Sequence, residues 1–102
     1  VLRDYPQDYR NSLVLGNLGR VQEMMGKEVE AMDSYTSALK LSPQSVPLLE
    51  ARAALYLRLG NLSKAVADYT TIIDREPGNL QALSYRAYAH SKQRNYIEAK
   101  QD

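Results

Sequence analysis

The chain has 102 residues, one domain's worth, and its 44% hydrophobic and 25% charged residues are typical of a folded globular protein. Its 13 Lys and Arg against 12 Asp and Glu give a formal net charge of +1, which argues against binding nucleic acid or a membrane surface by bulk electrostatics. The absence of cysteine excludes disulfides, thiolate zinc sites and a thiol nucleophile, and no apolar run approaches the roughly 18 residues that cross a bilayer.

The start of the chain does not have the features of a signal peptide. A chain without cysteine is also compatible with a reducing compartment, so we expect a cytoplasmic protein. Because the first residue is Val1 rather than Met, and because the sequence begins in the middle of a pattern, we expect the chain to be part of a longer protein.

An internal repeat of 34 residues organises the sequence. One shift by this interval aligns Leu15 with Leu49, Gly26 with Gly60, Ala31 with Ala65, Tyr35 with Tyr69, Thr36 with Thr70, and Pro43 with Pro77. A second shift aligns Arg52 with Arg86, Ala53 with Ala87, Asn61 with Asn95, Ala65 with Ala99, and Asp68 with Asp102. Two successive matches at one period predict a repeat protein.

Residues 1–11 are predicted to be the end of a preceding unit and its connecting turn. Residues 1–6 resemble residues 72–77, which have the pattern of a helix end followed by a closing proline.

The first unit is predicted at residues 12–45. From Pro6 to Pro43 is 37 residues, three more than the repeat interval. We therefore expect about one extra helical turn in the first helix of this unit, starting near Asp8, with Gly26 in the turn that follows.

The second unit, residues 46–79, has the pattern of two helices joined by a short turn. Ser45 is placed to cap the first helix, and Gly60 to end it, because glycine enters the left-handed conformation without a Cβ penalty. Asn61 is placed to cap the second helix, and Asn79 to cap the helix that follows. Helices joined by so short a turn pack antiparallel.

The third unit, residues 80–102, is predicted to be truncated. By the repeat period, its first helix ends in a turn at Arg94-Asn95, and a second helix begins after it.

Small residues are predicted to let the helices of each hairpin approach closely. Two helix axes come within about 8 Å only where the side chains between them are small. The residues in question are Ala31, Ala65 and Ala99 on the second helices, Ala53 and Ala87 on the first, and the adjacent rings of Tyr35 and Tyr69.

This pattern resembles the tetratricopeptide repeat family. The second unit carries its positions as Leu49, Ala53, Tyr56, Ala65, Tyr69 and Pro77. The first carries them as Leu15, Leu18-Gly19, Ala31, Tyr35, Ala38 and Pro43, and the third as Leu83, Ala87, Tyr96 and Ala99. Gln22, Arg52 and His90 depart from the pattern. The resemblance implies an all-α fold, a right-handed α-solenoid of helix-turn-helix repeats that is incomplete at both ends, with weak stability or end-to-end association as a consequence.

The resemblance also implies a concave groove lined by the first helix of each unit. Such a shallow surface suits an extended peptide or a partner helix better than a small molecule. The groove residues that it implies are Asn17, Arg20, Met24, Glu50, Ala54, Arg58, Gln81, Tyr85, Tyr88 and Lys92, together with Leu13, Ala51 and Ser84. Tyr85 and Tyr88 are the candidate anchors, although they are equally suited to packing against a following helix.

Some family members hold the acidic C-terminal tails of heat-shock chaperones in a clamp of Lys, Asn and Arg side chains. The corresponding positions here are Gly16, Arg20, Ala51, Gln81 and Tyr85. Because Arg20 is the one cation among them, the sequence disfavours binding of a chaperone tail.

Residues that suggest chemistry have simpler interpretations. His90 occupies a position that the family fills with a packed tyrosine, so we expect it in the core or half-buried. The carboxylate pairs Asp68 with Glu98 and Glu28 with Glu30 are expected on solvated helix faces rather than in an active site.

Four further positions also favour structural roles. The Met24-Met25 pair is expected to fill core space. Gly19 is explained by close helix approach, whereas Gly16 is expected to cost about 1 kcal/mol of helix stability relative to Ala. The glycosylation sequon that begins at Asn61 is interpreted as a helix cap.

We therefore expect a protein–protein interaction scaffold that binds a peptide or partner helix in its groove, with no catalysis, cofactor or metal, and with no nucleic-acid or membrane partner. Two alternatives stay open. The chain is a structural or self-associating segment of a longer array, or it is an accessory domain of a larger enzyme.

Overall fold

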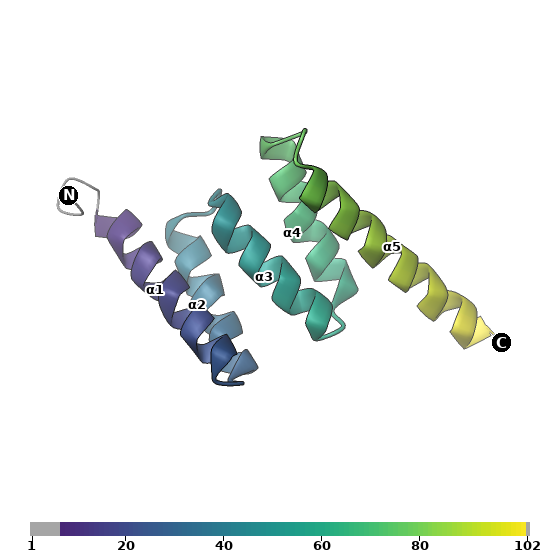
Figure 1. Cartoon of the computed structure of the whole chain (residues 1–102), viewed down its shortest axis with the longest axis horizontal. Coiled ribbons are helices and arrows are strands. Elements are labelled where there is room, and N and C mark those ends of the chain that lie inside the picture. The colour runs from purple at the N-terminus through teal and green to yellow at the C-terminus, as the bar shows by residue number, and fades with distance from the viewer. Residues whose placement is uncertain (1–6, 102) are drawn as a thin grey trace.

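Five α-helices follow one another through residues 7–101, the part of the chain that the computed structural model describes, with the side chains of Tyr9 and residues 98–101 excepted. The helices are α1 (Gln7–Met24), α2 (Glu28–Leu41), α3 (Val46–Arg58), α4 (Leu62–Arg75) and α5 (Leu80–Gln101). Each helix packs against the next in chain order, and the molecule extends over 57 × 32 × 18 Å (Figure 1). The predicted all-α fold of sequentially packed helical hairpins is confirmed. The prediction for residues 1–6 lies outside the described residues. Residues 7–11, which were predicted to belong to the preceding unit and its connecting turn, form the start of α1 instead.

Two glycines form the turns inside the hairpins. Gly26 follows α1 with φ +79° and Gly60 follows α3 with φ +80°, both in the left-handed region that disfavours a Cβ atom. The next helices then begin within two residues, at Glu28 and Leu62. The sequence prediction of tight turns at these two glycines is confirmed.

Asparagine caps begin the later helices. The Asn61 side chain accepts a hydrogen bond from the Lys64 backbone N–H at 3.4 Å, and Asn79 accepts one from Ala82 at 3.0 Å. Ser45 occupies the cap position of α3 but makes no side-chain cap hydrogen bond. The proline in the first turn of α3, Pro47, favours the helix start there instead, because its fixed φ suits the first turn.

The α1 helix carries the additional length that the proline spacing predicts. It has 18 residues against 13 in α3, the corresponding first helix of the next hairpin. None of the helices described is both long and apolar enough to span a membrane.

The alanine-and-tyrosine seam forms the core of the stack. Ala31, Ala53 and Ala65 have no exposed surface, and the rings of Tyr35 and Tyr69 are buried beside them. This close approach confirms the predicted packing of the hairpins α1–α2 and α3–α4.

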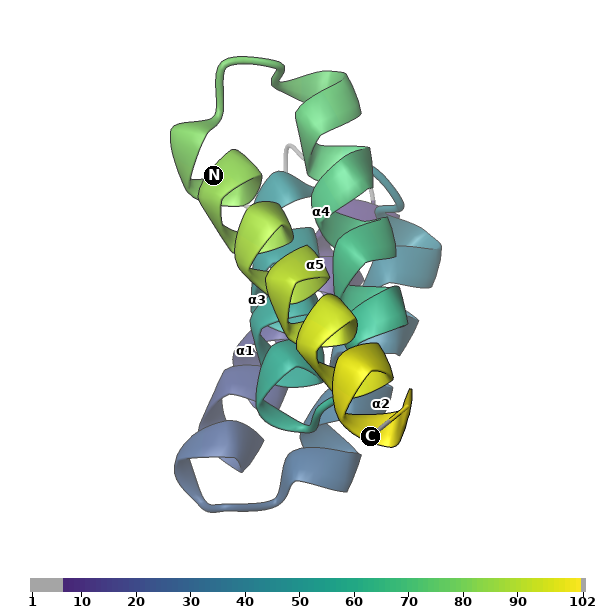
Figure 2. The ribbon, with the colours of Figure 1, turned by 90° about the vertical axis from the view of Figure 1, so that its right-hand side faces the viewer.

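The predicted turn at Arg94-Asn95 is wrong, because α5 runs without interruption for 22 residues (Figure 2). Arg94 stands where the two earlier hairpins have Gly26 and Gly60, and a residue with a Cβ atom disfavours the left-handed turn. No described helix folds back on α5, so Ala87 is exposed rather than part of a seam. The predicted role of Ala99 lies outside the described side chains.

Both glycines inside α1 allow close approach of a neighbour. A Cβ atom on Gly19 would lie 2.7 Å from the Tyr35 ring, which confirms the explanation from helix packing. A Cβ atom on Gly16 would lie 2.8 Å from a terminal methyl group of Leu48 on α3. Gly16 therefore also lies at a packing position between two hairpins, which the sequence interpretation as a helix-propensity cost did not include.

Candidate functional site

A hollow of about 920 Å³ lies between α1 and α3 and reaches the turn at residues 42–45. Gly16 lines this hollow and leaves the space beside α1 open, because glycine has no side chain. The α1 wall carries Leu13, Asn17 and Arg20, while the α3 wall carries the apolar residues Pro47, Leu48 and Ala51.

A second hollow of about 600 Å³ lies between α3 and α5. The α3 wall contains small side chains, such as Ala54, with Glu50 and Arg58 placed two helical turns apart. The α5 wall contains Gln81, Tyr85 and Tyr88, and Tyr69 of α4 contributes to the lining. Ala51 of α3 lines both hollows, so the two adjoin at this helix. We call the two hollows together the groove.

The structure brings most of the sequence-predicted groove residues together. Asn17 and Arg20 line the first hollow. The second hollow is lined by Glu50, Ala54, Arg58, Gln81, Tyr85 and Tyr88. Met24 and Lys92 line neither of these two hollows.

Aromatic rings form one wall of the second hollow. The rings of Tyr69 and Tyr85 stack with centroids 5.6 Å apart and 17° between their planes. Tyr69 is 2% exposed, whereas Tyr85 is 43% and Tyr88 51% exposed. The Lys92 ammonium lies 5.5 Å from the centre of the Tyr88 ring. Burial raises the pKa of the Tyr69 phenol to about 12.

Arg58 is held by carboxylates from the preceding hairpin. Its guanidinium contacts Glu23 at 2.8 Å and Glu28 at 3.0 Å. The other oxygen of Glu23 accepts a hydrogen bond from the Tyr35 hydroxyl at 2.5 Å. Burial, together with this hydrogen bond, raises the pKa of the Tyr35 phenol above its ordinary value. Arg58 therefore ties α3 to α1 and α2 in addition to lining the groove.

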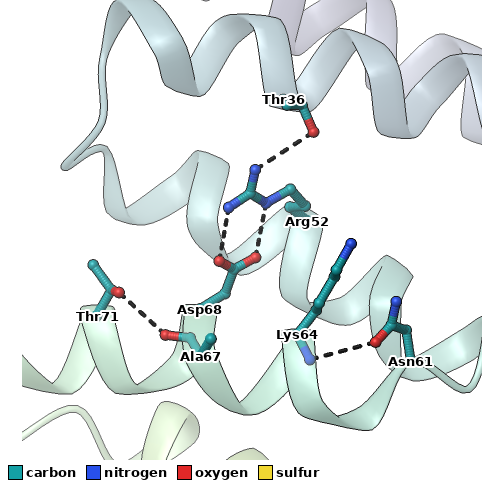
Figure 3. Close-up of polar contacts among 7 residues, drawn as sticks. All are labelled: Thr36, Arg52, Asn61, Lys64, Ala67, Asp68 and Thr71. Carbon is teal, nitrogen blue, oxygen red and sulfur yellow. Dashed lines mark hydrogen bonds and ion pairs between the residues drawn. The ribbon is translucent and has the colours of Figure 1, made fainter.

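A buried ion pair that the sequence analysis did not anticipate joins α3 to α4. Arg52 donates two hydrogen bonds of 2.8 Å to the two oxygens of Asp68, and a third of 3.4 Å to Thr36 on α2 (Figure 3). The hydrogen bonds to Asp68 raise the pKa of Arg52. Since Asp68 is 5% exposed, the expectation that it lies on a solvated face is wrong.

The repeat alignment contained the signal for this arrangement. Arg86 lies 34 residues after Arg52 and donates a hydrogen bond of 3.3 Å to Thr70, as Arg52 does to Thr36. The matched Arg and Thr positions are therefore explained by the same polar contact between successive hairpins.

Two further expectations about burial are wrong. His90 is exposed rather than in the core, because no described helix covers that side of α5. Met24 is 87% exposed and Met25 is also exposed, because both lie where α1 ends and the chain turns outward at Gly26. Among the residues that the structure describes, no group of three or more acidic or histidine side chains is placed to hold a metal ion.

Comparison with known proteins finds one protein family. Residues 46–79 match the family model described as tetratricopeptide repeat. A tetratricopeptide repeat protein from Parabacteroides merdae ATCC 43184 is 39% identical with a TM-score of 0.82, covering 98% of this chain and 39% of that chain. The first TPR of Spaghetti (RPAP3), solved bound to the HSP90 peptide SRMEEVD, is 29% identical with a TM-score of 0.77, covering 91% and 74%.

Tetratricopeptide repeat protein 14 of Mus musculus is 38% identical over 60% of this chain and 8% of the mouse protein. The chain spans 6–21% of the length of six curated relatives that it matches.

Proposed function

Because the chain belongs to the tetratricopeptide repeat family of protein-interaction modules, we propose that its groove binds an extended peptide or a helix of a partner protein, without catalysis by the chain itself. The main observation in support of this proposal is that the two hollows meet at Ala51, which lines both of them. Together they offer a ligand one path across α1, α3 and α5.

The chemistry of the walls supports a peptide ligand. Aliphatic and aromatic side chains line the groove together with the polar groups of Asn17, Glu50 and Gln81. Tyr85 and Tyr88 retain about half of their surface for a partner, and tyrosine is a common anchor in protein interfaces. A chaperone tail is not the ligand we propose, although the similar domain of Spaghetti was solved with such a peptide.

The test is selection from a random 12-residue peptide display library on the 102-residue chain, followed by affinity measurement on two matched variants. Tyr88→Ala removes a ring from the groove. Tyr96→Ala removes an exposed ring from the same helix outside both hollows. We expect Tyr88→Ala to weaken binding of the selected peptides about tenfold with an unchanged melting temperature, and Tyr96→Ala to leave it unchanged. Failure to select any peptide, or equal effects of the two variants, contradicts the proposal.

A second candidate function, self-association, is favoured by an apolar stripe on α1. Val14, Leu18 and Val21 recur at helical spacing on one face of this helix, and all three are exposed. Exposed stripes of this kind are common at protein interfaces. Sedimentation analysis of the chain over a range of concentrations tests this candidate.

A further inference from the structure

We propose that the groove selects peptides by charge, with an acidic side chain of the ligand beside Arg20 in the first hollow and a basic side chain beside Glu50 in the second. The inference rests on the proposed function, since it names the chemistry of the peptide that the groove would bind.

The first hollow presents positive charge that the protein itself leaves uncompensated. Arg20 is exposed, and none of the described residues makes a hydrogen bond or an ion pair with it. Arg75 lines the same hollow and donates a hydrogen bond to the Gln44 amide oxygen, with no carboxylate partner in the described part of the chain. Glu23 also lines this hollow, but its two oxygens are engaged by Tyr35 and Arg58. An acidic side chain of a ligand is therefore the complementary group here.

The second hollow has the opposite arrangement. Glu50 is half-buried, and no hydrogen bond or ion pair joins its carboxylate to another residue within the described range. Arg58, the cation in this hollow, is already bonded to Glu23 and Glu28. A partly buried carboxylate without a partner favours a cation.

Aromatic surface in the second hollow adds to this preference. Tyr85 and Tyr88 line the same space as Glu50, and each is about half exposed. A Lys or Arg side chain of the ligand gains from the face of an aromatic ring as well as from a carboxylate, as Lys92 already does on Tyr88. A basic side chain fits this hollow better than an aliphatic one, which would leave Glu50 uncompensated.

The two subsites adjoin at Ala51, the residue next to Glu50. Packed helices lie about 8–10 Å apart, and an extended peptide advances about 3.3 Å per residue. The acidic and basic side chains of the ligand are therefore expected about two or three residues apart. A small or apolar residue is expected between them, where the peptide crosses Ala51.

Peptide display on the 102-residue chain tests the inference, with Arg20→Gln and Glu50→Gln as the variants. Glu30→Gln and Lys40→Gln are the matched controls, because both residues are exposed on α2 and line neither hollow. We expect the selected peptides to carry one acidic and one basic residue at a fixed spacing. Arg20→Gln is expected to weaken the acidic preference alone, and Glu50→Gln the basic preference alone. For an individual selected peptide, each variant is expected to weaken binding about fivefold, and less at high salt.

The double variant Arg20→Glu with Glu50→Lys is expected to select peptides of the reversed charge order. Selected peptides without a charge preference, or preferences that survive both variants, overturn the charge inference and leave the proposed function standing. Failure to select any peptide contradicts the proposed function and this inference with it.

Discussion

The guanidinium of Arg52 on α3 and the carboxylate of Asp68 on α4 face each other edge to edge, with two hydrogen bonds of 2.8 Å. The Asp68 side chain is 8% exposed and that of Arg52 is 20% exposed, so the pair is shielded from water. Replacing only one residue of such a pair destabilises the folded state, because the remaining charge stays buried without its counter-charge.

The first prediction is that Asp68→Asn destabilises the chain by about 2–3 kcal/mol, measured as the free energy of unfolding in urea. The double variant Arg52→Met with Asp68→Leu removes both charges and keeps the volume, and is expected to be nearly as stable as the parent chain. A single variant no more destabilised than the double variant would show that the pair contributes nothing specific.

Gly19 and Gly16 provide a matched pair of substitutions. Gly19→Ala places a Cβ atom against the buried ring of Tyr35, which has no room to move, so we expect a loss of about 1–2 kcal/mol after the gain in helix propensity. Gly16→Ala meets the terminal methyl group of Leu48, which can rotate away, so we expect little change or a small gain. Thermal unfolding of both variants measures the difference, and equal melting temperatures would contradict it.

The buried tyrosines predict a loss of stability at alkaline pH. The pKa of Tyr69 is about 12 in the folded chain against about 10 when unfolded, so the folded state holds its proton more strongly. The contribution of this pKa difference to the free energy of unfolding is complete below pH 10. It declines between pH 10 and pH 12 by about 1.4 kcal/mol per pH unit for one such group. Urea unfolding between pH 8 and 11 measures this slope. Tyr69→Phe is expected to flatten it, and Tyr96→Phe, at an exposed ring, to leave it unchanged. An unchanged slope in Tyr69→Phe would exclude this residue as the source.

The chaperone peptide that the Spaghetti domain binds provides a direct test of whether this groove holds a terminal carboxylate. Because Arg20 is the one cation at the clamp positions, the peptide SRMEEVD and its C-terminally amidated form, which lacks the terminal charge, are expected to bind with equal affinity. Fluorescence anisotropy with labelled peptides measures both affinities. Tighter binding of the free carboxylate, abolished by amidation, would establish a clamp in this groove.

Self-association through α1 predicts a concentration-dependent increase in sedimentation coefficient. Leu18→Glu is expected to abolish the increase, because it places a charge in the middle of the exposed stripe. Leu80→Glu alters an equally apolar exposed residue at the start of α5 and is expected to have no effect. A chain that stays monomeric at all concentrations would contradict this role for the stripe.

The hairpins were predictable because single residues determine them. Gly26 and Gly60 supply the left-handed turns, and Asn61 and Asn79 supply the caps, each through local chemistry that the sequence displays. The predicted third turn was wrong because the prediction followed the repeat period. It did not take into account that Arg94, unlike Gly26 and Gly60, carries a Cβ atom.

Burial and ion pairing were harder to predict, since they depend on which helix covers a face. The contact between Arg52 and Asp68 joins residues 16 positions apart on two helices, and that between Arg58 and Glu23 joins residues 35 apart. Their geometry follows from the relative rotation of the helices, which a hydrophobic pattern does not specify. Most of the predicted groove residues nevertheless line the two hollows, because their positions follow from the choice of first helices alone.

The hydrogen bond from Arg52 to Thr36, with its counterpart between Arg86 and Thr70, affects how the molecule yields under tension. Each guanidinium joins a helix to the last helix of the preceding hairpin, α3 to α2 and α5 to α4. Pulling the helices apart at such a junction therefore requires breaking the hydrogen bond between Arg and Thr as well as separating apolar surfaces. When the protein is stretched from its ends, we expect discrete steps of extension rather than a gradual increase in length. One step is expected for each junction that has this hydrogen bond.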